Sequence, residues 1–180
     1  MDKKDARNLI KERRMNLSTE YIDTASDKIF EKLLENEDFK NAKVIMSYMD
    51  FKNEVKTDKI NDYIKKAGKT LVLPKVITKE KMIAIEDKNK YIVSPFGNSE
   101  PDGEEYIGEI DVIITPGVAF DREKNRVGFG RGYYDRFFAI HKNAKKIAIA
   151  FEKQIIEEGI ETTEYDMKVD VLITEDNIIY

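Results

Sequence analysis

Alternating glycines set between arginines are the most distinctive chemical feature of the sequence: Gly128, Gly130 and Gly132, with Arg126 and Arg131. Glycine reaches positive φ angles and lets the backbone approach a ligand closely. Successive N–H groups in such a loop can bind an anion, and guanidinium groups match phosphate oxygens in pairs. The spacing fits neither a Walker loop nor the first turn of a dinucleotide-binding fold. A tight turn without a ligand would show the same glycines, so spacing alone leaves both interpretations open.

A carboxylate follows this loop at Asp135, directly after Tyr133 and Tyr134. We expect a helix to begin here, and an acid one turn from a phosphate loop could hold Mg²⁺. An aspartate in a first helical turn is also favoured by the helix dipole alone, so these two roles stay equally open. The tyrosines could stack on a ligand ring or pack in the core.

Composition excludes several kinds of function. The chain has 180 residues, a net charge of −4 and no cysteine, which rules out disulfides and thiolate metal sites. We expect neither nucleic acid nor a membrane as a partner, because the chain as a whole is acidic. No apolar run approaches the roughly 18 residues that span a membrane, and residues 1–5 lack the apolar stretch of a secretory signal. We expect one domain over residues 1–180, cytoplasmic and monomeric.

The elements that must position these residues alternate between strands and helices. Short apolar runs predict buried strands at residues 43–49, 70–73, 111–114, 146–151 and 169–173. Helices are predicted around Ile10, after an N-cap at Ser18 or Thr19, after an N-cap at Thr57, and at residues 133–140, with Gly68 ending the third of them. The sequence therefore predicts an α/β fold: an open, mainly parallel sheet with helices on both faces. The glycine loop would lie beyond the carboxyl end of strand 111–114, where such sheets bind ligands.

Three further expectations concern the middle of the chain. Pro74 should stop the second strand. Residues 82–85 and 91–93 should form a hairpin or a pair of edge strands, and residues 94–106 should form a long loop.

The chain resembles a known family along nearly its whole length. Residues 115–121, followed by 126–136, are similar to the signature of the 5-formyltetrahydrofolate cyclo-ligases, also called methenyltetrahydrofolate synthetases. Similar pieces occur at residues 3–7, 48–57, 73–76, 100–101 and 166–170.

The resemblance implies an ATP-dependent enzyme that converts 5-formyltetrahydrofolate to 5,10-methenyltetrahydrofolate, with ADP and phosphate as the other products and Mg²⁺ as cofactor. It implies that Asp135 and Asp166 ligate Mg²⁺, and that Arg131, Tyr133 and Asp135 are catalytic. It implies that ATP contacts the following residues: Lys3, Lys4, Arg7, Arg126, Val127, Gly128, Phe129, Gly130, Arg131, Gly132, Tyr133 and Tyr134. It implies that the folate contacts another set: Met49, Glu54, Phe129, Gly130, Arg131, Gly132 and Tyr133.

Several of these residues also have an ordinary structural interpretation. Glu54 could be a solvated loop acid rather than an acceptor for the pterin's N–H groups. The basic residues of the first helix could form a solvated face. His141, the single histidine, is expected to be a C-terminal helix residue stabilised by the dipole rather than a catalyst. Lys75 could reach phosphates from a strand end.

Three positions depart from the common family pattern. Arg131 stands where lysine or glycine is frequent, Tyr165 where many members have histidine, and Lys56 where an acid is usual. Tyr165 removes an imidazole from that position but leaves the neighbouring carboxylate.

Two other classes of function compete with the enzyme. One is a non-catalytic folate- or nucleotide-binding module, against which the combination of loop, Asp135 and Glu54 argues. The other is RNA binding through the basic first helix, which ranks last because acids such as Asp5 and Glu12 interrupt its charge.

Overall fold

A single seven-stranded sheet forms the centre of the molecule. The computed structural model describes all of residues 1–180. The strand order is β11-β10-β9-β6-β1-β2-β3, and the five inner strands run parallel to one another. Only the two edges are antiparallel. The bounds are β1 Val44–Met46, β2 Thr70–Val76, β3 Met82–Glu86, β6 Val112–Thr115, β9 Lys145–Ile149, β10 Val171–Ile173 and β11 Ile178–Ile179. The predicted open, mainly parallel sheet is confirmed.

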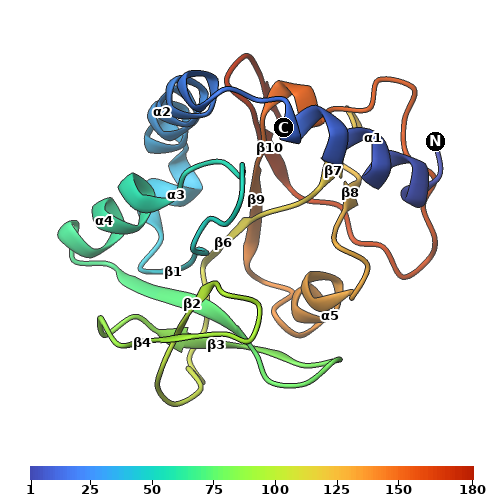
Figure 1. Cartoon of the computed structure of the whole chain (residues 1–180). Coiled ribbons are helices and arrows are strands. Elements are labelled where there is room, and N and C mark those ends of the chain that lie inside the picture. The colour runs from blue at the N-terminus through green and yellow to red at the C-terminus, as the bar shows by residue number, and fades with distance from the viewer.

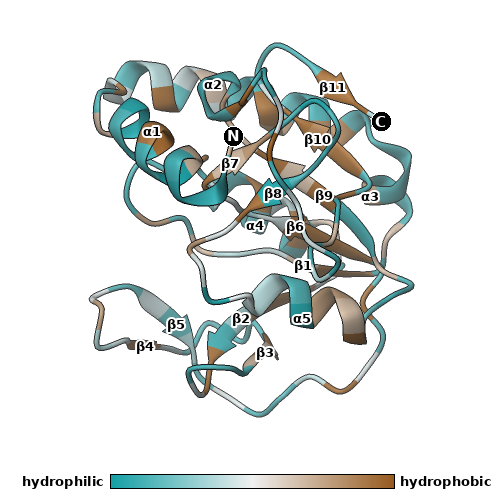
Figure 2. Cartoon of the chain, turned by 90° about the vertical axis from the view of Figure 1, so that its right-hand side faces the viewer, coloured by the Kyte–Doolittle hydropathy of each residue, from teal (hydrophilic) through white to brown (hydrophobic).

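Helices cover both faces of this sheet, as expected (Figure 1). On one face lie α2 (Thr19–Glu35), α3 (Glu37–Asn41) and α4 (Asp58–Lys66), and on the other lie α1 (Lys3–Met15) and α5 (Tyr133–Ile140). Alternation along the strands explains the two layers. Val112 and Ile114 of β6 pack with α2 and α4, whereas Ile113 packs with Phe137 and Phe138 of α5. Figure 2 shows hydrophobic residues along strands β6, β9 and β10, whereas α1 is mainly hydrophilic.

A small hairpin carries the glycine loop. Strands β7 (Ala119–Phe120) and β8 (Arg126–Val127) pair antiparallel, and the loop runs from β8 to α5. Ala6 and Ile10 of α1 pack on Ala119 and Val127 of this hairpin. The first helix is therefore held directly against the base of the loop.

The cap predictions at two helices are confirmed. The Ser18 side chain accepts a hydrogen bond from the Tyr21 N–H at 3.0 Å, and Gly68 follows the end of α4 with a φ of 72°. The Thr57 prediction is wrong in its mechanism. Thr57 precedes α4 without capping it, because its hydroxyl bonds to Asp50 across the preceding loop.

Pro74 does not stop the second strand, contrary to expectation. Strand β2 continues to Val76, and Pro74 lies opposite Ala84 of β3. The Ala84 carbonyl accepts from Tyr106 instead of bonding to β2, so Pro74 and Ala84 form a non-hydrogen-bonded pair. The missing N–H of Pro74 points to the other side, where β1 has already ended, so proline costs no ladder bond.

Of the two alternatives predicted for residues 82–85 and 91–93, the hairpin is wrong, whereas the edge position is confirmed for β3, which ends the seven-stranded sheet. Strand β3 pairs with β2, whereas β4 (Tyr91–Val93) pairs with β5 (Ser99–Pro101) in a separate two-stranded sheet. The expected long loop at 94–106 therefore contains β5. The remaining element is a short 3₁₀ turn, η1 (Glu152–Gln154).

Candidate active site

Two adjoining pockets lie at the carboxyl ends of the central strands. The connection from β1 leads to β2 on one side, while the chain from β6 leads to β9 on the other. The crevice between β1 and β6 is thus the point where the strand order reverses, the usual ligand position in open α/β sheets. Pro116, directly after β6, contributes to both pockets. The fold therefore places both pockets where a ligand is expected.

The first pocket, here called the loop pocket, has a volume of about 260 Å³. Its walls come from α1, the glycine loop, the start of α5 and the segment before β10. The lining residues are Lys3, Arg7, Pro116, Arg126, Val127, Gly128, Phe129, Gly130, Arg131, Gly132, Tyr133, Tyr134, Asp135 and Asp166.

The glycines of the loop are required by its geometry. Gly130 has a φ of 94°, and Gly132 precedes α5 with a φ of 67°, a conformation that side chains disfavour. Gly128 lacks a positive φ, but a Cβ there would lie 3.0 Å from the Arg126 guanidinium. The prediction that glycine permits unusual backbone angles thus holds for two positions, and close approach explains the third.

Arg126 is the most enclosed cation of the loop pocket. Its residue is 8% exposed, and its guanidinium lies against the rings of Tyr134 and Phe138. Nη1 donates to the Pro116 carbonyl at 3.2 Å, and Nη2 lies 3.6 Å from the Asp135 carboxylate. Burial lowers the pKa of Arg126, and its buried Nε has no hydrogen-bond partner. This leaves an unsatisfied donor beside the loop.

The other cations differ in how they are held. Arg7 donates from Nε to the Gly128 carbonyl at 2.8 Å, and Lys3 forms an ion pair with Asp166. The Arg131 side chain is exposed and has no partner within the protein, so it is free to contact a ligand.

The two predicted metal-binding carboxylates line the same pocket. Asp135 accepts from the Met167 N–H at 3.3 Å, which ties the start of α5 to the segment carrying Asp166. Burial acts to raise the pKa of Asp166, but hydrogen bonds from Lys3 and Thr163 outweigh it and lower the pKa. The structure contains no cluster of three or more Asp, Glu or His side chains that could hold a metal ion. The two carboxylates would suit an ion that takes its remaining ligands from phosphate and water, as Mg²⁺ does.

The second pocket, here called the apolar pocket, has a volume of about 260 Å³ and nine hydrophobic residues among its sixteen. It lies between the loop after β1, the end of β2 and strand β5. The lining residues are Tyr48, Met49, Phe51, Glu54, Leu73, Pro74, Val76, Met82, Asn98, Ser99, Glu100, Pro101, Pro116, Phe129, Tyr133 and Tyr134.

Glu54 is the polar centre of the loop after β1. Its carboxylate accepts a hydrogen bond from the Phe51 N–H at 2.8 Å. Burial raises the pKa of Glu54 to about 7, against the opposing effects of that hydrogen bond and of the Arg14 guanidinium. Glu54 can therefore be neutral or ionised near neutral pH, so it can donate or accept towards a ligand.

A shared wall separates the two pockets. Besides Pro116, the residues Phe129, Tyr133 and Tyr134 line both pockets. Phe129 is 63% exposed, although it stands at the centre of the site. Tyr134 lies edge-on to Phe138, which fixes its ring from the α5 side. Ligands in the two pockets would thus contact opposite sides of the same aromatic side chains.

The residues predicted for ATP gather in the loop pocket with one exception. Lys4 is exposed on α1 and does not line the pocket, whereas its neighbour Lys3 does. Among the predicted folate contacts, Met49, Glu54, Phe129 and Tyr133 line the apolar pocket. Three others, Gly130, Arg131 and Gly132, line only the loop pocket.

Sequence reasoning missed some lining residues and left others without a role. Tyr48, Leu73 and Glu100 lie in segments that resemble the family, and this was the available signal. Lys75 lines neither pocket; its amino group lies 3.9 Å from Asp102. His141 ends α5 as expected, but burial lowers its pKa and it stacks on Phe137. Burial and stacking therefore favour the neutral imidazole, whereas the helix dipole was expected to stabilise the charged one.

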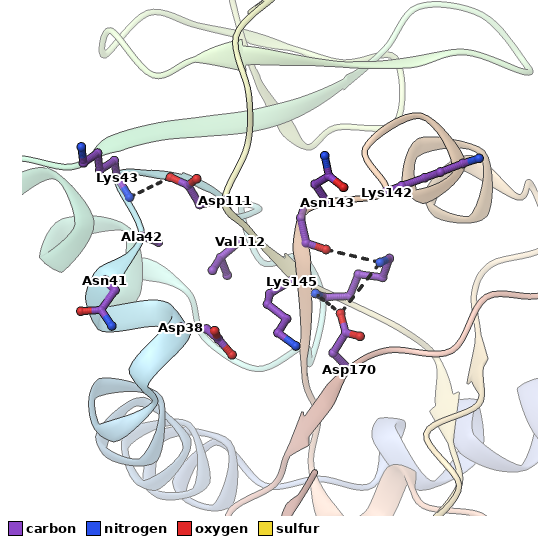
Figure 3. A pocket seen from close by; sticks show the side chains of 12 residues that line it. Asp38, Asn41, Ala42, Lys43, Asp111, Val112, Lys142, Asn143, Lys145 and Asp170 are labelled. Atoms are coloured by element: carbon purple, nitrogen blue, oxygen red, sulfur yellow. Dashed lines mark hydrogen bonds and ion pairs between the residues drawn. The ribbon is translucent and has the colours of Figure 1, made fainter.

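A larger depression of about 660 Å³ lies at the opposite, amino-terminal edge of the sheet (Figure 3). Two of its three carboxylates, Asp111 and Asp170, are bonded within the protein, and the third, Asp38, is exposed. Asp111 accepts from the N–H groups of Lys43 and Val44 at 2.9 Å, and Asp170 accepts from the Lys146 N–H at 2.8 Å. None of the predicted site residues lines this depression. The predicted site residues, apart from Lys4, therefore lie at the loop pocket and the apolar pocket.

Comparison with known proteins assigns the fold and site to a family. The model of the 5-formyltetrahydrofolate cyclo-ligase family matches residues 1–175. The chain belongs to this family. It is therefore an enzyme of folate one-carbon metabolism.

Individual cyclo-ligases agree with the assignment. The mouse 5-formyltetrahydrofolate cyclo-ligase is 30% identical, with 97% of this chain and 94% of the mouse protein covered. The solved 5,10-methenyltetrahydrofolate synthetase of Aquifex aeolicus is 35% identical and superposes with a TM-score of 0.83, covering 98% of this chain and 91% of that one. The Mycoplasma pneumoniae synthetase is 30% identical with a TM-score of 0.77, covering 97% of this chain and 99% of that one.

The helices of this cyclo-ligase are all too short or too polar to span a lipid bilayer.

Proposed function

We propose that this cyclo-ligase uses ATP and Mg²⁺ to convert 5-formyltetrahydrofolate to 5,10-methenyltetrahydrofolate, with release of ADP and phosphate. The observation that carries the proposal is the shared wall. A cationic glycine loop and an apolar pocket meet at Phe129, Tyr133 and Tyr134. A phosphoryl donor and an aromatic acceptor bound in the two pockets would meet there.

The reaction needs activation of a poor electrophile. The formyl oxygen attacks the γ-phosphorus, and ADP leaves with the electrons of the broken P–O bond. N10 of the folate then attacks the formyl carbon, loses its proton to solvent, and the C–O bond breaks to release phosphate. Such a sequence depends chiefly on positioning and on neutralising phosphate charge.

The residues of the loop pocket supply these requirements. Arg7, Arg126 and Arg131 offer guanidinium groups, and the free N–H groups and the dipole at the start of α5 would favour a phosphate there. When bound between Asp135 and Asp166, Mg²⁺ would neutralise charge on the phosphate oxygens. The ion pair between Lys3 and Asp166 would then have to open, which frees Lys3 for the nucleotide.

The apolar pocket supplies the folate end. Met49 is 38% exposed and Phe51 39%, so a bound ring system would cover apolar surface that water now contacts. Glu54 would bind the amino and ring N–H groups of the pterin. The chain has no cysteine, and its one histidine lies outside both pockets. The proposed reaction requires no protein nucleophile.

An absorbance assay tests the proposal directly. The protein is mixed with 5-formyltetrahydrofolate, ATP and Mg²⁺, and formation of methenyltetrahydrofolate is followed in the near ultraviolet. Parallel reactions omit ATP or replace Mg²⁺ with a chelator. We expect turnover only in the complete mixture. Turnover without ATP would reject the phosphorylation step, and calorimetric binding of folate without any turnover would favour a non-catalytic binding module.

A further inference from the structure

Arg14, near the end of α1, is a buried cation that forms no ion pair. Its residue is 9% exposed. Nε donates to the Asn53 carbonyl at 3.2 Å, and Nη2 donates to the Lys52 carbonyl at 3.1 Å. Burying a guanidinium is costly unless its hydrogen bonds are satisfied. Here two backbone carbonyls, from a loop 38 and 39 residues away, accept hydrogen bonds from it.

Those two carbonyls belong to an unusual stretch of backbone. Lys52 has a φ of 41° and Asn53 a φ of 25°, in the left-handed region that residues with a Cβ disfavour. Such backbone persists only where the surroundings fix it. The Asn53 side chain also donates to the Arg14 carbonyl at 2.9 Å, so hydrogen bonds run in both directions. Arg14 and Asn53 together clamp the turn onto α1.

The clamped turn lies inside the segment that lines the apolar pocket. Met49 and Phe51 precede the turn and Glu54 follows it, and all three line the pocket. The Phe51 N–H donates to the Glu54 carboxylate, so the shape of the turn and the position of Glu54 are linked. Elsewhere the segment is held by the Lys56 N–H bond to Ser26 and by the contacts between Asp50 and Thr57. Only the Arg14 clamp acts on the left-handed residues themselves.

We propose that Arg14 is a positioning residue for the folate substrate. It holds the Lys52–Asn53 turn so that Met49 and Glu54 keep their places in the apolar pocket, without touching the substrate itself. This inference rests on the proposed function of that pocket. It assigns to α1 a second role besides carrying Lys3 and Arg7 at the loop pocket.

The test compares Arg14→Met, which removes the charge but keeps the length, with Arg14→Lys, which keeps the charge but loses the forked donor. Lys11→Met is the matched control, because Lys11 lies exposed on the same helix and has no partner. The absorbance assay gives kcat and KM for 5-formyltetrahydrofolate and for ATP. Thermal unfolding checks that each variant folds.

We expect Arg14→Met to raise the KM for 5-formyltetrahydrofolate about tenfold, the scale of losing hydrogen bonds from a buried charged donor. The KM for ATP should stay within about twofold. Arg14→Lys should recover part of the loss, and Lys11→Met should match the wild type. A folded Arg14→Met variant with an unchanged folate KM would overturn the inference, as would equal changes in both KM values.

A second variant keeps the test decisive if Arg14→Met fails to fold. Asn53→Gly removes the side-chain bond to α1 and lets the backbone leave the left-handed region more easily, so the turn is held less firmly by the two remaining Arg14 bonds while α1 stays intact. We expect the same selective rise in folate KM, and its absence would overturn the inference. An inactive wild-type protein would instead reject the proposed function, so the two failures are distinguishable.

Discussion

The loop pocket and the apolar pocket share a wall but are stabilised in opposite ways. Every charged side chain of the loop pocket except Arg131 already contacts a partner within the protein. Four cations and two carboxylates line this pocket, so it keeps two unbalanced positive charges. In the apolar pocket, by contrast, the apolar side chains of Met49 and Phe51 stand more than a third exposed beside Glu54.

This difference indicates two sources of affinity. A phosphate ligand entering the loop pocket would exchange existing contacts for its own, so its affinity depends on geometry and salt. A ring entering the apolar pocket would gain mainly by removing apolar surface from water. Variants in the two pockets should therefore differ in which substrate they affect, and the following predictions test that separation.

The largest effect is expected at Asp135. Asp135→Asn keeps the size of the side chain but removes the charge proposed to hold Mg²⁺. We expect kcat to fall about 100-fold or more, since metal and phosphate positioning carry this type of catalysis. The absorbance assay over a range of Mg²⁺ concentrations measures it. Asp38→Asn, an exposed change at the opposite edge of the sheet, is the control. Wild-type rates at limiting Mg²⁺ would remove Asp135 from the metal site.

A smaller, selective effect is expected at the glycine loop. Gly130→Ala adds a Cβ at a φ of 94°, 3.6 Å from the Arg7 guanidinium. The loop must change its backbone, so we expect the KM for ATP to rise about tenfold, with the folate KM little changed. Gly97→Ala is the matched control, because it has a φ of 85° in open space away from the loop pocket. Equal kinetic effects in both variants would show that backbone strain alone is responsible.

A substitution in the shared wall should affect both substrates rather than one. Phe129→Ala removes a ring that lines both pockets. We expect the KM values for ATP and for folate to rise together, by about fivefold each, as apolar contact is lost on both sides. Steady-state kinetics with each substrate varied in turn measures this. An effect on one substrate alone would show that the ring serves a single pocket.

The smallest predicted effect concerns stability and pH at Glu54. Its pKa is about 7 in the folded protein, above the ordinary 4.5. The neutral form is thus favoured on folding: its stabilisation is complete below pH 4.5 and is lost as pH rises through 7. Glu54→Gln cannot ionise and escapes this loss. We expect the unfolding free energy of Glu54→Gln, relative to that of the wild type, to rise by about 1 kcal/mol between pH 4.5 and 8. This figure allows for solvent screening of the half-buried side chain.

Urea unfolding at several pH values measures the Glu54→Gln difference. Because the amide oxygen can still accept from Phe51, the local hydrogen bond should remain. Parallel curves of stability against pH for the two proteins would show that Glu54 does not titrate between these limits.

The sequence predicted what depends on local pattern. The glycines, Arg126 and Asp135 occur within ten residues of one another, so the loop pocket could be inferred from spacing and from family resemblance. The parallel sheet followed from apolar runs alternating with helical periodicity. Strand β5 was missed, because three residues containing a proline and an acid show no strand pattern. The role of Arg14 depends on contacts with residues far along the chain, which no local pattern reveals.

The shared wall has a consequence for protein engineering. Because Phe129, Tyr133 and Tyr134 line both pockets, a change that adapts one pocket to a different ligand also reshapes the other. Substitutions in the wall should combine non-additively with changes on either side. A redesign of specificity has more freedom at the outer walls, at Arg7 on one side or at Leu73 and Met82 on the other. The same coupling limits how independently natural variation can alter the two substrates.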